Sequence, residues 1–168
     1  MNENIKKLIA YLKYLNLRID INNSRDRFKL QKLAFLLKSM GIELNYEFKF
    51  HYYGVYSAEL SKESYEYKNE INKLKSDYEI NDNEKLILER LKENFPDNNI
   101  LEATTTIIYE NLVYSDINEI IEKVKKIKPH LSEFDIISGI NLAKKLLFKK
   151  EYFTEEIKQE LEAWDLID

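Results

Sequence analysis

Hydrophobic side chains recur at helical spacing along most of the chain. In the first segment Ile5, Leu8, Leu12 and Leu15 fall on one stripe, with lysines outside it. Similar stripes follow at Leu86–Leu91, Leu101–Leu112, Asp116–Pro129 and Ser132–Leu147, and a last helix is predicted from Thr154, with Trp164 as its packing anchor. The pattern therefore predicts a mainly α protein.

The segment Asp26–Met40 is predicted to be the central helix. Leu30, Leu33 and Leu37 make one apolar face, whereas Phe28 and Phe35 project from nearly the opposite side. A helix that is apolar on two sides is usually buried between two layers. The stretch Asn22-Asn23-Ser24 offers N-cap residues before it, and Gly41 offers a left-handed C-terminal cap.

A strand is predicted after this helix. Phe48, Phe50 and Tyr52 alternate with Lys49, His51 and Tyr53, and Gly54 then interrupts the pattern. Ser57 is a candidate cap for a helix from Ala58 to about Leu74, and Tyr78-Glu79-Ile80 is a candidate second strand. We therefore expect a compact bundle of about seven to eight helices with a minor β component. That component would be a two-stranded aromatic ribbon or wing near residues 48–54 and 77–81.

The expected domain organisation is a single domain over residues 1–168. The turn Pro96-Asp97-Asn98-Asn99 is the best candidate boundary between two sub-lobes, residues 1–95 and 100–168. Gly139 interrupts the helix after Ser132, and we expect it to allow the close approach of a neighbouring helix.

Composition favours a globular protein of the cytoplasm. Charged residues make up 33% of the chain and hydrophobic residues 44%, proportions that are typical of a folded protein. The chain has no cysteine, which fits a reducing compartment. It also has no apolar run of the roughly 18–20 residues that a membrane span needs, and its first residues lack the apolar core of a secretory signal.

The net charge of −4 is unevenly distributed. Residues 1–62 contain eleven Lys and Arg against six Asp and Glu, so the remainder is strongly acidic. One hypothesis is a winged-helix-like DNA-binding regulator that uses Arg25, Arg27, Lys29 and Lys32, with the aromatic strand as its wing. The alternative is that the basic and acidic parts face each other or that these charges lie on solvated helix faces, because the segment holds no basic run.

Candidate catalytic chemistry is sparse. His51 and His130 are the only histidines, and neither has a metal-ligand partner at typical spacing. No glycine-rich phosphate loop or nucleophile elbow occurs in the sequence. We therefore expect a protein that is not an enzyme and that uses no cofactor or metal.

The segment Arg25–Leu60 carries a family resemblance. It contains Lys29-Leu30-Gln31-Lys32-Leu33, then Phe35-Leu36-Leu37, an aromatic strand, and Tyr53-Gly54-Val55-Tyr56-Ser57-Ala58-Glu59-Leu60. This pattern resembles the YwgA-like proteins of bacteria and archaea and the broader SocA-type antitoxin, or Panacea, domain. The family usually has Gly-Pro-Tyr-Ser where this chain has Gly54-Val55-Tyr56-Ser57, so the fixed φ of proline is absent here.

The resemblance implies a non-enzymatic protein-interaction module, an antitoxin-like regulator that binds a partner protein. The expected partner is a protein, with a toxin as one candidate, and nucleic acid is the alternative. No membrane partner is expected. The oligomeric state stays open, and a homodimer is one option. The same motif residues also suit a purely architectural role. The residues expected at the partner-binding surface are Gln31, Lys32, Phe35, Tyr52, Tyr53, Gly54, Tyr56, Ser57 and Leu60.

Overall fold

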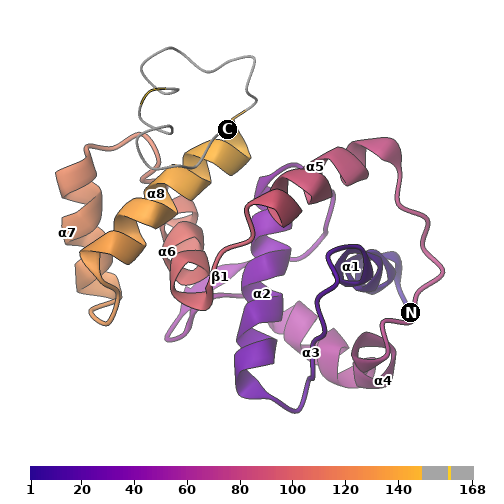
Figure 1. Cartoon of the computed structure of the whole chain (residues 1–168). Coiled ribbons are helices and arrows are strands. Elements are labelled where there is room, and N and C mark those ends of the chain that lie inside the picture. Colours follow the sequence, from indigo (N-terminus) through magenta and orange to yellow (C-terminus); the bar gives the residue numbers. More distant parts are fainter. Residues whose placement is uncertain (149–158, 160–168) are drawn as a thin grey trace. The chain divides into compact units, whose positions relative to one another are not determined.

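The computed structural model describes residues 1–148 and residue 159. It divides into two compact units, Met1–Glu93 and Asn94–Asp168, which are described one at a time below (Figure 1). Apart from Gln159, the helix predicted from Thr154 and its anchor Trp164 lie outside the described residues.

The prediction of a mainly helical fold with a small two-stranded sheet is confirmed. The described residues form eight helices and one antiparallel pair of strands. In chain order the elements are α1 (Glu3–Tyr14), α2 (Ser24–Ser39), β1 (Lys49–His51), β2 (Gly54–Tyr56), α3 (Ala58–Glu66), α4 (Lys68–Asn72), α5 (Asp82–Glu93), α6 (Asn98–Tyr109), α7 (Ile117–Ile127) and α8 (Glu133–Leu147).

In the unit Met1–Glu93, α2 occupies a central position. Its N-terminus is capped by Asn23, whose side chain accepts hydrogen bonds from two backbone N–H groups of the first turn. Its chain leaves through Gly41 at a φ of 109°, as the sequence predicts. Leu30, Leu33 and Leu37 are almost completely buried. The first predicted face of this helix is therefore core.

The second apolar face of α2 packs against the aromatic segment that follows the helix. The Phe28 ring is stacked on Tyr53 with centroids 4.8 Å apart. The Phe35 ring meets Phe48 edge-on at 5.4 Å. The prediction that α2 is apolar on two sides is thus confirmed, and this second face positions the hairpin β1–β2.

The predicted strand pairing is wrong. β1 pairs with β2, in the register Lys49 with Tyr56 and His51 with Gly54, rather than with residues 77–81. Residues 77–81 form no strand, and two polar groups of Tyr78 bond to nearby side chains. The Tyr78 N–H donates to Ser76 Oγ at 3.2 Å, and the Tyr78 hydroxyl donates to Glu84 at 2.7 Å.

The helix predicted from Ala58 to about Leu74 is divided in two. The Ser57 hydroxyl caps α3 by accepting from the Leu60 N–H at 3.2 Å, as predicted. The helix ends at Glu66 because Tyr67 has non-helical backbone angles, and α4 then adds a short separate helix. Leu74 follows with a φ of 52°, which turns the chain away.

The unit that begins at Asn94 has a core of its own. Buried side chains of α6, α7 and α8 form it, including Ile107, Ile120, Val124 and Ile140. α8 crosses α6 closely, because a Cβ on Gly139 would lie 2.8 Å from the Cβ of Ala103. The expectation of a close helix approach at Gly139 is therefore confirmed.

Candidate partner-binding surface

The hairpin β1–β2 presents two adjacent tyrosines at its tip. Tyr52 and Tyr53 form the two-residue connection between the strands, and their side chains are 89% and 60% exposed. Gly54 follows at a φ of 100°, a left-handed conformation that suits glycine. This glycine therefore lets β2 leave the turn without strain.

A buried amide of α2 clamps the far end of β2. The Gln31 side chain donates from Nε2 to the Ser57 carbonyl at 3.0 Å, and its Oε1 accepts from the Ser57 N–H at 2.8 Å. Both residues are buried. One side chain thus bonds both backbone groups of Ser57, as a neighbouring strand would do, and the Ser57 carbonyl also accepts from the Ser61 N–H at 3.0 Å.

Lys32 binds the Tyr52–Tyr53 tip directly. Its side chain is only 8% exposed, and its ammonium group donates to the Tyr53 carbonyl at 3.2 Å. The same ammonium lies 5.6 Å from the centre of the Phe28 ring. Since Phe28 also stacks on Tyr53, the backbone and the ring of this tyrosine are both held by α2.

The other predicted surface residues support the hairpin. Leu60 is fully buried, Gly54 is buried, and Phe35 is half-buried against Phe48. Tyr56 is half-buried with its ring edge-on to His51 at 5.0 Å. Of the nine residues expected at the partner-binding surface, only Tyr52 and Tyr53 are therefore exposed.

The four residues of the nucleic-acid hypothesis have different surroundings. Arg25 is exposed in the first turn of α2, whereas Lys29 is half-buried and has a partner in the structure. Arg27 donates to the Ile21 carbonyl at 2.8 Å and lies over the Tyr65 ring. Because Lys32 holds Tyr53, at least two of these four cations are engaged inside the unit.

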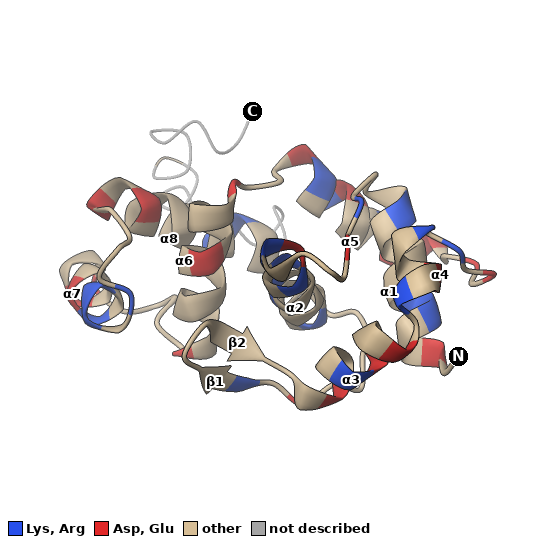
Figure 2. Ribbon diagram, turned by 90° about the horizontal axis from the view of Figure 1, so that it is seen from below, with Lys and Arg blue, Asp and Glu red and all other residues tan. Residues whose placement is uncertain are grey.

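The surroundings of the tip are nevertheless positive. Residues 49–56 contain one lysine, one histidine and no acidic residue, and residues 25–32 contain four basic residues and one acidic residue. Figure 2 shows a basic position on β1 and no acidic position on either strand, whereas α1 and α3 carry both signs. The two segments thus carry a net positive charge, and Arg25 and Lys49 are its exposed members.

The sequence gives weak signals for two buried carboxylates in the same unit. Glu63 is 6% exposed and accepts from the Tyr46 hydroxyl at 2.6 Å and from the Asn2 amide. Glu84 is 7% exposed and accepts from the hydroxyls of Tyr11 and Tyr78. Glu63 could have been found from its spacing, since it lies three residues after the buried Leu60 on the same helix face.

The tyrosine partners of these carboxylates have raised pKa values. Burial, and then the hydrogen bond to Glu84, raises the pKa of Tyr78 to about 12. Burial and the neighbouring glutamate likewise raise the pKa of Tyr11 and of Tyr46 above the ordinary tyrosine value. At neutral pH these hydroxyls are therefore protonated and donate hydrogen bonds to the two buried carboxylates.

Residues 1–148 contain no group of three or more His, Asp or Glu side chains that could hold a metal ion. Within the same residues, no helix is both long and apolar enough to cross a bilayer.

Comparison of the chain with known protein families, with curated proteins and with solved structures finds no match. The structure itself defines a class: a mainly helical protein with one small antiparallel sheet. Within that class, the distinguishing feature of this chain is an exposed pair of tyrosines on a hairpin that α2 holds in place.

Proposed function

We propose that this chain is a non-enzymatic interaction module that docks the Tyr52–Tyr53 tip into a pocket on a partner protein. The observation that carries the proposal is the exposure of both rings on a hairpin fixed by Gln31, Lys32 and Phe28. Tyrosine dominates binding hot spots because it buries a large amphipathic ring with few torsions to restrict. A tip that is already ordered loses less entropy when it binds.

The charge around the tip indicates the kind of partner. The exposed Arg25 and Lys49 would pair with an acidic rim around an apolar pocket, which raises the association rate and the specificity of the encounter. The resemblance of Arg25–Leu60 to YwgA-like and Panacea proteins supports a regulatory partner, with a toxin as one candidate. In this proposal the module controls that partner by covering its surface.

The protein partner is favoured over duplex DNA by the state of the basic residues. Lys32 points its ammonium at the Tyr53 carbonyl, and Arg27 is bonded to the Ile21 carbonyl. A DNA-binding surface would need such groups directed at phosphates. Engagement of these two cations inside the unit leaves fewer charges for that task.

The test is direct binding to the products of neighbouring genes. Each product would be co-expressed with the full chain, and any complex would be measured by calorimetry with the wild type, Tyr52→Ala and Tyr53→Ala. Loss of a hot-spot tyrosine should weaken binding about 30-fold, since a hot spot contributes about 2 kcal/mol or more. Tyr114→Ala is the matched control because Tyr114 is 83% exposed but belongs to the other unit.

The proposal fails if Tyr114→Ala weakens a complex as much as Tyr52→Ala does, or if no neighbouring product binds the folded chain. A parallel titration with duplex DNA at about 50 mM salt examines the alternative, because phosphate binding is strongest at low salt. If the chain binds duplex DNA, if that binding declines steeply with added salt, and if Tyr52→Ala leaves it unchanged, the nucleic-acid hypothesis is favoured instead.

A further inference from the structure

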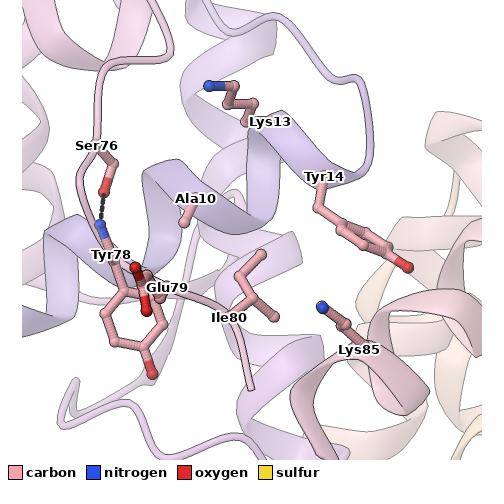
Figure 3. A pocket seen from close by; sticks show the side chains of 8 residues that line it. All are labelled: Ala10, Lys13, Tyr14, Ser76, Tyr78, Glu79, Ile80 and Lys85. Atoms are coloured by element: carbon pink, nitrogen blue, oxygen red, sulfur yellow. Dashed lines mark hydrogen bonds between the residues drawn. The ribbon is translucent and has the colours of Figure 1, made fainter. Parts of the chain in front are cut away.

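A pocket of about 580 Å³ lies in the unit Met1–Glu93, away from the hairpin. Figure 3 shows it between α1, residues 76–80 and the first turn of α5. Its volume is within the usual range for small-molecule sites. The lining residues are Ala10, Lys13, Tyr14, Ser76, Tyr78, Glu79, Ile80 and Lys85.

The two aromatic side chains of the pocket are held in place. The Tyr78 hydroxyl donates to the buried Glu84 at 2.7 Å, and the Tyr14 hydroxyl donates to Glu89. The Lys92 ammonium lies 5.4 Å from the centre of the Tyr14 ring. In Figure 3 the two rings lie on either side of Ile80. The pocket thus offers ordered rings around an apolar centre, which suits a flat ligand.

The two lysines of the pocket differ from the lysines close by. Lys6 pairs with Asp77 at 3.4 Å, and Lys7 donates to the Glu43 carbonyl at 3.2 Å. The exposed ammonium groups of Lys13 and Lys85, in contrast, have no hydrogen bond or ion pair within residues 1–148. Against them the lining has one carboxylate, that of Glu79. Among the lining residues two ammonium groups thus stand against one carboxylate, while the carboxylates of Glu84 and Glu89 beside the pocket are bonded to the tyrosine hydroxyls.

We propose that this pocket binds a small anion that carries a planar ring. The ring would contact Ile80 and the tyrosines, while Lys13 or Lys85 would reach the anionic group, a carboxylate or a phosphate, with its long side chain. None of the lining residues belongs to the hairpin. This site and the partner-binding surface can therefore be confirmed or refuted separately.

Amide chemical-shift titration of the full chain tests the proposal. The probes are adenosine 5′-monophosphate and benzoate, which carry a ring with a phosphate or a carboxylate, and the control probe is neutral adenosine. At least one anion should shift the amide signals of Ala10, Ile80 and Lys85 saturably by about 10 mM, the range of weak small-ligand sites. The anion that binds identifies the group the pocket prefers.

Charge-neutral variants locate the site. Lys13→Gln or Lys85→Gln should weaken binding about tenfold, the effect of one charge-assisted hydrogen bond. Lys62→Gln removes an equal charge from an exposed position on α3, and it should leave binding unchanged. The proposal is overturned if neither anion gives saturable shifts, if adenosine binds as tightly as its monophosphate, or if Lys62→Gln weakens binding as much as the pocket variants.

Discussion

Replacement of Gln31 by leucine tests how much the unit Met1–Glu93 depends on the amide clamp. Leucine has a similar volume but no hydrogen-bonding group, so the buried Ser57 N–H loses its partner, whereas the Ser57 carbonyl keeps its bond from the Ser61 N–H. A buried group left without a partner costs about 1–3 kcal/mol, so the free energy of unfolding should fall by about 1–3 kcal/mol. That is a large part of the roughly 5–15 kcal/mol that stabilises a domain.

Urea unfolding followed by circular dichroism measures this change, and amide hydrogen exchange assigns it to one unit. The midpoint should fall with an unchanged slope, because the exposed surface stays similar. In thermal unfolding the midpoint temperature should fall by about 4 °C or more, given about 4 °C or more per kcal/mol for a unit of this size. Lys62→Leu, at an exposed position of α3, is the matched control.

The variant Gln31→Glu separates the hydrogen bonds from packing. A carboxylate still accepts from the Ser57 N–H, but it places a negative oxygen beside the Ser57 carbonyl. Its destabilisation should shrink as the pH falls and the carboxyl becomes protonated, because a protonated carboxyl can donate to that carbonyl. The reasoning is refuted if Gln31→Leu stays within about 0.5 kcal/mol of the wild type, the range of ordinary surface changes.

Three further predictions concern two glycines that leave no room for a side chain or need a left-handed backbone, and one tyrosine with a raised pKa. Gly54→Ala forces a side chain into the left-handed region at a φ of 100° and should lower the free energy of unfolding by about 1–2 kcal/mol in urea. Gly139→Ala places a Cβ at 2.8 Å from Ala103, so the unit that begins at Asn94 should lose about 1–3 kcal/mol, and an unchanged urea midpoint would contradict the close contact. Since the pKa of Tyr78 rises from 10.0 when unfolded to about 12 when folded, the folded state holds its proton more tightly, and stability should decrease as the pH rises from about 10 to about 12. Tyr78→Phe should flatten that decrease in unfolding curves recorded across this pH range, and an unaltered pH dependence would argue against the assigned pKa.

Local signals in the sequence identify much of the fold. The caps at Asn23, Ser57 and Ser132 mark helix starts because each supplies a side-chain oxygen to an otherwise unbonded N–H group. The seven-residue spacing of Phe28 and Phe35 identifies the second face of α2, since it returns to the same side of a helix. These features depend on neighbours within one or two turns, so sequence reasoning reaches them.

Contacts between residues that lie far apart in the sequence leave no such local signal. The three-residue β2 is too short to show an alternation pattern, and the Tyr52-Tyr53 connection lacks the Asn-Gly signal of tight hairpins. For these reasons the sequence favours Tyr78-Glu79-Ile80 as the partner of β1. At the candidate surface, the sequence predicts Tyr52 and Tyr53 as partner-binding residues, but it predicts the same role for Gln31. Only the hydrogen bonds across 26 residues show that Gln31 is buried support.

The side-chain amide at Ser57 also protects a sheet edge. A two-stranded hairpin is marginally stable in water, and its outer backbone groups can recruit a strand from another chain. At the end of β2, the groups that a foreign strand would use are already occupied by Gln31. Aggregation through strand addition is therefore disfavoured at that position, and any association of the hairpin there has to rely on side chains.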